Sequence, residues 1–253
     1  MSRLSQKSLD FIAKASKQKS PAWIEKNEAE YHDVLVEPVA HLAREVSRQL
    51  RGIAPAYRFP TRGFARLRRS SQRAQAQGTY KDWVGIHVSR ESGSRYEDLP
   101  NLYFHLSPED QFSAGGLFMA SAGQVRRMRS WIDQDPRQLE QLLADPAFKK
   151  VYPELGIEKQ VKTFPRGFPK DHPRIDWLKL TGYYVWRPIP KKVLFSSSFP
   201  EILAADWKQV LRLNSLLDDW ISREPRQAED ESPGPVRSEL EKKQPRSPDQ
   251  WDW

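Results

Sequence analysis

Apolar side chains recur every three or four residues near both ends of the chain, which is the spacing that places them on one face of a helix. Gly52 and Pro55 mark the end of the clearest helix, whose apolar stripe is Val39, Leu42, Ala43, Val46 and Leu50. The spacing predicts helices over residues 4–18, 20–50, 121–134, from 135 onward, 173–179 and 200–221. Pro38 either kinks the second of these helices or restarts it.

The middle of the chain changes to a period of two, which is typical of half-buried strands. In one segment Tyr103 and His105 share a face, and the opposite face carries Leu102, Phe104 and Leu106. The pattern predicts strands over residues 64–68, 83–89, 102–106, 111–119, 162–164 and 182–189. Gly115-Gly116 indicates a bulge or a close backbone approach. Strands grouped between helical ends predict an α+β fold, with a mostly antiparallel sheet packed against helices from the N- and C-terminal parts.

The composition changes near residue 223, where proline and charged residues replace most apolar ones. Such a segment buries too little surface to offset its ordering entropy. We therefore expect a single α+β domain over residues 1–222 and a disordered tail over 223–253. The tail ends in Trp251-Asp252-Trp253, which is either a docking peptide for a protein partner or a chance ending.

The 253 residues include no cysteine, which excludes disulfides, thiol nucleophiles and cysteine-bound zinc. No apolar run is long enough to span a membrane, so no membrane association is expected. The polar N-terminus lacks the apolar core of a signal peptide, and we expect a cytoplasmic protein. Glycine-rich nucleotide loops, nucleophile elbows and zinc-protease motifs are also missing.

The formal net charge of +8 comes from one stretch of the chain, residues 44–90. This stretch holds eleven basic residues, nearly all arginine, and only Glu45 and Asp82 oppose them. Arginine presents planar paired donors that suit phosphate or carboxylate. The stretch is therefore either an anion-binding surface or a solvated face whose arginines pair with acids elsewhere in the fold.

Six residues are candidates for ligand binding, because they combine cationic groups with aromatic and imidazole rings. We expect them to converge on a cleft beside the sheet: Arg66, Arg69, Tyr80, Lys81, His105 and Arg166. The ligand would be a phosphorylated small molecule or a nucleic-acid backbone, since arginine neutralises phosphate while an aromatic ring stacks on an unpaired base. The alternative is that the aromatic rings belong to the core.

A proline-rich loop over residues 164–173 presents a candidate catalytic pair, Asp171 and His172. A carboxylate beside an imidazole can set its tautomer, as a general base requires. The alternative is structural, with Asp171 capping the next helix. A metal site built from His87, His105 and His172 has no supporting spacing, so we assign no metal and no cofactor.

The sequence resembles the DUF2461 family, a group of uncharacterised proteins, over residues 9–221. The resemblance rests on Trp23-Ile24 with Tyr31 and Pro38, Tyr80-Lys81, Tyr103-Phe104-His105-Leu106, Gly115-Gly116-Leu117-Phe118, Pro165-Arg166-Gly167-Phe168 and Asp171-His172-Pro173. One segment departs from the family pattern of an Arg-Asp pair, Arg-Phe, a lysine and Pro-Tyr-Lys. Here Ser70 stands in place of the acid, Gln72-Arg73 in place of Arg-Phe, and Thr79 in place of the proline. The resemblance implies the fold and carries no activity.

Three functions are consistent with these features. The first is an anion-binding domain that uses the arginine-rich cleft. The second is an enzyme acting on an anionic substrate through Asp171 and His172. The third is a protein-interaction domain that docks through its C-terminal tail. The ligand and the oligomeric state do not follow from the sequence.

Overall fold

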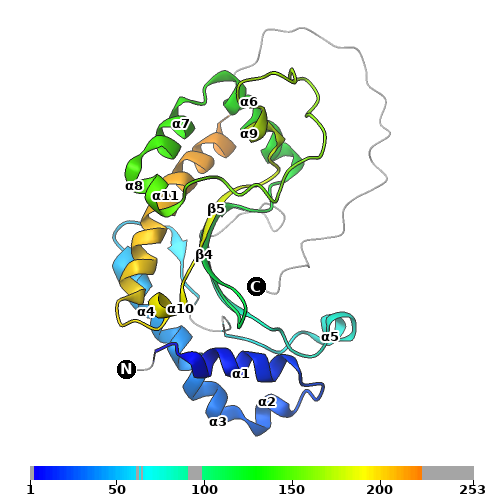
Figure 1. Cartoon of the computed structure of the whole chain (residues 1–253), viewed down its shortest axis with the longest axis vertical. Helices are drawn as coiled ribbons and strands as arrows, with labels where there is room; N and C mark the ends of the chain where they lie inside the picture. The colour runs from blue at the N-terminus through cyan, green and yellow to red at the C-terminus, as the bar shows by residue number, and fades with distance from the viewer. Residues whose placement is uncertain (1–2, 61–62, 64, 91–98, 224–253) are drawn as a thin grey trace.

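The computed structural model describes residues 3–60, 63, 65–90 and 99–223, and Figure 1 shows their arrangement. The helical elements are α1 Gln6–Ser16, α2 Trp23–Lys26, α3 Glu28–Tyr31, the π-helical turn η1 His32–Val36, α4 Glu37–Leu50, α5 Ser71–Gln77, α6 Ala122–Gln134, α7 Arg137–Ala144, α8 Pro146–Val151, α9 Ile175–Lys179, α10 Lys191–Leu194 and α11 Phe199–Ser222. The strands are β1 Tyr57–Arg58, β2 Val84–Arg90, β3 Asn101–Leu106, β4 Gln111–Leu117 and β5 Tyr183–Pro188. The fold is therefore α+β, as the sequence predicts.

The five strands form one antiparallel sheet in the order β1-β2-β3-β4-β5. The register is continuous across its centre, where Tyr103 on β3 lies opposite Ala114 on β4, and Ala114 opposite Trp186 on β5. Gly115 and Gly116 keep this register, so β4 contains no bulge. The prediction of a mostly antiparallel sheet is confirmed.

Helices cover one face of the sheet, with α4, α10 and α11 lying to one side of β4 and β5 in Figure 1. The apolar side chains that face them are buried, including Leu102, Phe104 and Leu106 from β3. Helix α11 comes so close to β4 that a side chain at Gly115 would place its Cβ 2.4 Å from Val210 and 2.5 Å from the Asn101 carbonyl oxygen. The glycine therefore allows a close approach, which is one of the two alternatives that the sequence suggested.

The N-terminal helices join the same hydrophobic core. The apolar stripe predicted along α4 is buried, and Pro38 lies in the first turn of that helix, directly after η1. Val36 and Glu37 keep helical backbone angles, and the Glu37 N–H donates to the His32 carbonyl. The helix therefore continues through η1 into α4, and Pro38 follows a π-helical irregularity without starting a new helix. Over the described part of the chain, none of the helices combines the length and apolar content that a bilayer crossing needs.

Two strand predictions are wrong where the structure describes them. Between residues 65 and 68 only Arg68 makes a single bridge, to Tyr80, and Phe64 lies outside the described residues. The Ala65 carbonyl accepts the Tyr31 hydroxyl (2.7 Å) instead of a strand partner. Residues 162–164 also form no strand, and the nearest bridge joins Gln160 to Leu180. Short elements such as β1, α5 and α10 carry too little periodicity to be predicted.

The second face of the sheet is free of helices over the described residues (Figure 1). Alternation along the strands brings polar and aromatic side chains to this open face, among them His87, Tyr103, His105, Phe112, Tyr184 and Trp186. The predicted tail lies outside the described residues apart from Arg223. Of these side chains Tyr184 is buried, Trp186 is exposed and the others are partly buried.

Candidate functional site

A pocket of about 380 Å³ lies on the open face, between β3, β4, β5 and the loop that carries Glu158. Its floor is β4 at Ala114, Gly115 and Gly116. Ala114 stands between larger neighbours on the adjacent strands, Tyr103 and Trp186. Because small residues occupy the middle strand and large ones flank it, the sheet surface is hollow at this point.

Aromatic rings form the walls of the pocket and pack edge to face with one another. The ring of Phe112 lies 6.0 Å from Trp186 and 5.9 Å from Tyr103, centroid to centroid, and Phe118 lies 4.8 Å from Tyr184. Edge-to-face packing is a favoured geometry for aromatic pairs and holds each ring in one orientation. The walls are therefore built before any ligand arrives.

The loop after α8 brings a carboxylate to the rim. The Gly156 N–H donates to the Tyr184 carbonyl (2.7 Å), and a side chain at Gly156 would collide with the Tyr184 ring. Two residues later Glu158 accepts hydrogen bonds from Trp186 Nε1 (3.0 Å) and from the Tyr184 hydroxyl. Burial opposes ionisation of Glu158, but these hydrogen bonds and one from its own backbone outweigh it and lower its pKa. Glu158 is therefore a fixed negative charge at neutral pH.

Asp110 contributes a second carboxylate to the lining, from the tight turn between β3 and β4. This turn is closed by the Ser107 N–H donating to the Asp110 carbonyl (2.8 Å) and by the Asp110 N–H donating to Ser107 Oγ (2.8 Å). The described residues that line the pocket include no arginine and no lysine. The pocket is therefore aromatic and locally negative, although the whole chain is basic.

His105 lies next to this pocket, stacked on Phe112 at 4.6 Å with the rings nearly parallel. Burial lowers the pKa of His105 to about 4, with Asp110 and Asp82 opposing that shift and Lys81 adding to it. The Tyr103 hydroxyl lies 3.0 Å from His105 Nδ1. Burial raises the pKa of Tyr103, so this hydroxyl stays protonated and can donate to the neutral imidazole. His105 is thus uncharged at neutral pH and does not attract an anion.

Lys81 is buried beside His105. Its Nζ lies 4.1 Å from the centroid of the Trp83 ring, and Trp83 stacks on His105 at 5.5 Å. Among the predicted ligand-binding residues, the structure brings Lys81 and His105 together through this ring. Trp83 itself was not predicted as a site residue, since nothing in its local sequence distinguishes it from a core aromatic.

Tyr80 and Arg69 form a second group, away from the pocket lining. The buried Tyr80 hydroxyl donates to the carbonyls of Ser20 (3.0 Å) and Pro21 (2.8 Å). Arg69 donates to the Tyr80 carbonyl and closes the loop that contains α5. Arg66 is exposed and donates to the Arg68 carbonyl (2.9 Å). These side chains hold their own segment against the N-terminal helices.

Arg166, Asp171 and His172 lie in the loop between α8 and α9, which Figure 1 places at the opposite end of the molecule from α5. The carboxylate that meets His172 is Asp133 on α6, with Oδ1 3.2 Å from Nε2. His172 Nδ1 accepts the Arg174 N–H (3.0 Å), so both ring nitrogens are engaged. Asp171 is exposed. The His172 imidazole is therefore engaged in structural hydrogen bonds, and its carboxylate partner is Asp133 instead of the adjacent Asp171.

The family model of a conserved hypothetical protein, DUF2461, matches residues 7–215. The chain belongs to the DUF2461 family. No curated protein and no solved structure gave a significant match. Two of the sequence blocks that resemble this family, at residues 103–106 and 115–118, lie on β3 and β4 and supply Tyr103, Gly115, Gly116 and Phe118 to the pocket.

The segment that departs from the DUF2461 pattern is the loop around α5. Ser70 immediately precedes this helix, and the half-buried Arg73 lies within it. Other arginines of the basic stretch pair with acids from distant elements, as in Arg68 with Glu25 (3.5 Å) and Arg90 with Asp218. Many arginines of the basic stretch thus form contacts within the fold of this family member.

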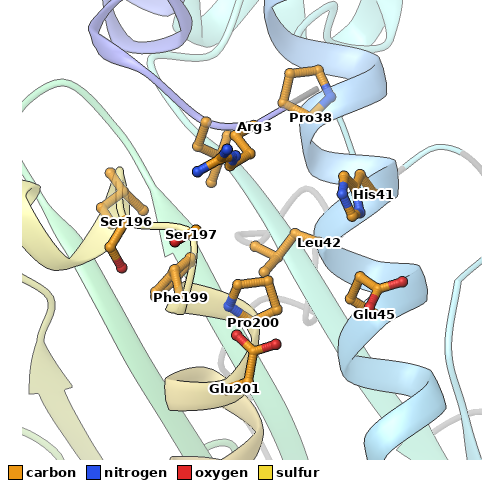
Figure 2. Close-up of a pocket in the computed structure, with 12 residues that line it drawn as sticks. Arg3, Pro38, His41, Leu42, Glu45, Ser196, Ser197, Phe199, Pro200 and Glu201 are labelled. Atoms are coloured by element: carbon orange, nitrogen blue, oxygen red, sulfur yellow. The ribbon is translucent and has the colours of Figure 1, made fainter. Parts of the chain in front are cut away.

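A smaller pocket of about 220 Å³ lies between α4 and the connection that leads into α11. Figure 2 shows Leu42 reaching from α4 toward Phe199 and Pro200, with His41, Glu45 and Glu201 around them. Glu45 is already paired with Arg48 (2.7 Å). The apolar part of the pocket lining comes from the packing of α4 against the start of α11, and we assign no ligand to this pocket.

The metal hypothesis depends on three histidines meeting. In the sheet register His87 lies opposite Tyr103, while His105 lies opposite Gly85, and His172 is in a distant loop. Within the ranges that the structure describes, no three His, Asp or Glu side chains are grouped as metal ligands. The open-face pocket is the strongest candidate site in the described chain.

Proposed function

We propose that this DUF2461 member binds a small organic molecule in the open-face pocket. One observation carries the proposal: a hollow walled by rings and floored by small residues lies on a sheet face that no described helix covers. A volume of 380 Å³ falls in the range of about 300–1,000 Å³ that is usual for ligand pockets. Its mixture of apolar walls and a few oriented polar groups is also typical of such sites.

The lining favours a neutral or cationic ligand over the anionic one that the sequence suggested. Glu158 and Asp110 would repel phosphate, and two arginines of the anion hypothesis, Arg66 and Arg69, donate to backbone carbonyls outside the pocket lining. Phosphate binding stays a proposal for the surroundings of Lys81, which is cationic, whereas His105 beside it is neutral. We include inorganic phosphate among the test compounds because it separates the two ideas.

The test is a fragment screen by ligand-observed NMR, comparing the native chain with Ala114→Phe. A phenylalanine at position 114 would fill the hollow between Tyr103 and Trp186. The matched control is Ala205→Phe, which adds the same ring on the exposed side of α11. We expect fragments that bind the native chain and Ala205→Phe but lose about tenfold or more in affinity for Ala114→Phe.

A second variant tests the same pocket in case Ala114→Phe does not fold. Trp186→Ala removes a wall residue that is 43% exposed, so the core beneath the sheet is kept. It should weaken the same fragments while the circular dichroism spectrum stays native. Fragments that bind all four proteins equally, or no binding at all, would contradict a ligand site in this pocket.

A further inference from the structure

The aromatic rings and the carboxylate of the pocket are arranged around one kind of ligand group. The walls are Tyr103, Phe112, Phe118, Tyr184 and Trp186, and Glu158 stands at their rim. The faces of aromatic rings carry partial negative charge, and they attract ammonium groups within about 6 Å of the ring centre. A full negative charge beside such rings adds to that attraction at short range.

Glu158 is held in place and stays ionised, and within the described ranges of the chain no basic side chain forms an ion pair with it. Both side chains that donate hydrogen bonds to it are neutral, Trp186 through Nε1 and Tyr184 through its hydroxyl. Both donors belong to rings that line the pocket, so they turn the carboxylate toward these rings. Hydrogen bonds orient the charge and leave it uncompensated for a ligand.

Two large apolar side chains lie next to Glu158, Ile157 as its neighbour along the chain and Trp186 through its hydrogen bond to the carboxylate. Ile157 is 57% exposed and Trp186 is 43% exposed, which is high for such large apolar side chains. A hydrated metal ion gains nothing from apolar surroundings, whereas the methyl groups of a substituted ammonium bury area against them. The rim therefore favours an organic cation over an inorganic one.

The chain already shows how one of these rings accepts a cation. Lys159, adjacent to Glu158, places Nζ 4.7 Å from the Phe118 centroid, with Met119 Sδ 4.0 Å away. Lys159 is not among the residues that line the pocket. Its charge opposes a second cation, and the carboxylates of Glu158 and Asp110 outnumber it at the site.

We infer that the ligand is an organic cation that carries a methylated ammonium group, seated against the aromatic walls with its charge toward Glu158. This inference rests on the proposed function of the pocket and specifies its ligand class. Choline is a suitable probe, because 3,3-dimethylbutan-1-ol has the same shape without the charge. Comparing the two isolates the contribution of the cation.

The experiment follows the indole N–H signals of the full chain by ¹H–¹⁵N NMR. The Trp186 signal is identified by its loss in Trp186→Phe. We expect choline to shift this signal and to bind at least fivefold more tightly than the neutral alcohol. Glu158→Gln should weaken choline about three- to tenfold and leave the alcohol unchanged. The matched control Glu154→Gln removes an exposed acid from the same loop, outside the pocket lining, and should change neither.

The failure of this inference is distinguishable from failure of the proposed function. Equal affinities for choline and the alcohol, or equal effects of Glu158→Gln and Glu154→Gln, would overturn the cationic ligand class while the pocket stays a ligand site. Tighter binding of inorganic phosphate than of choline at the Trp186 signal would also overturn it. If neither choline nor any fragment moved the signal, both proposals would fail.

Discussion

The hydroxyl of Tyr80 joins the loop after α5 to the turn between α1 and α2. It donates to the Ser20 and Pro21 carbonyls and accepts the Ile24 N–H (3.2 Å). The ring itself is buried and packs edge-on against Trp23 at 6.1 Å. A side chain with these contacts acts on the stability of the N-terminal region, and it leaves no exposed group for a ligand.

Replacing Tyr80 with phenylalanine should therefore affect folding and leave binding intact. Tyr80→Phe keeps the ring and removes the hydroxyl, which leaves the backbone groups of Ser20, Pro21 and Ile24 without their partner. We expect the free energy of unfolding to fall by about 1–3 kcal/mol, measured by urea denaturation. The affinity of the pocket for its fragments should not change. A large loss of affinity in the folded variant would restore the ligand-binding role that the sequence suggested for Tyr80.

The contact between β4 and α11 is the tightest junction of the two layers. The position of Gly115 on the helix-covered face lets Val210 of α11 sit directly against the strand backbone. The same strand provides the pocket floor on its other face through Ala114 and Gly116. Packing under the sheet and the shape of the pocket above it therefore depend on one strand.

Gly115→Ala should separate this strand from α11. Its Cβ would lie 2.4 Å from Val210 Cγ1, so the helix or the side chain must move. Overpacking of this kind costs about 1–3 kcal/mol, which thermal and urea unfolding would both detect. The control is Gly123→Ala in α6, where the nearest atom would lie 3.8 Å away. The control should be neutral or slightly stabilising, and equal losses in both variants would contradict the close approach.

At the scale of the whole molecule, α11 is tied to the far end of the sheet by a partly buried ion pair between Asp218 and Arg90. Burial raises the pKa of Asp218 to about 6, although Arg90 opposes the shift. The folded state therefore holds a proton on Asp218 more tightly than the unfolded state does. This contribution to stability is present below about pH 4 and is lost as the pH rises through 6.

Asp218→Asn should remove this pH dependence. We expect the unfolding free energy of the native chain, measured relative to Asp218→Asn, to fall by about 2 kcal/mol between pH 4 and pH 7. Urea denaturation of both proteins across this range gives the difference directly, and effects of other carboxylates cancel in it. A difference that is constant, or that grows with pH, would show that Arg90 outweighs burial.

Periodicity along the sequence was sufficient to predict the long elements. The α4 stripe and the β3 alternation each repeat over several turns or residues, and both are buried as expected. The predicted strand at residues 64–68 is wrong over its described part, because side chains take backbone groups that a strand would pair, as Tyr31 does at Ala65. Short segments are decided by such individual contacts.

The candidate site shows the same difference between what a local pattern predicts and what individual long-range contacts decide. The spacing of the sequence predicts that His105 lies on the second face of its strand, and it indicates a bulge or a close approach at the glycines of β4. Asp133 as the partner of His172, and Glu158 as the acid beside Trp186, lie 39 and 28 residues away along the chain. No local pattern predicts contacts of that separation.

The sequence by itself determined the α+β class, the antiparallel sheet and the two faces of its central strands, because each follows from the spacing of apolar side chains. Only the tertiary structure decided which groups meet. The pocket exists because Ala114 on one strand lies between Tyr103 and Trp186 on its neighbours, and because Gly156 lets the Glu158 loop lie against Tyr184. Those contacts depend on strand register and loop placement, which are properties of the folded chain as a whole.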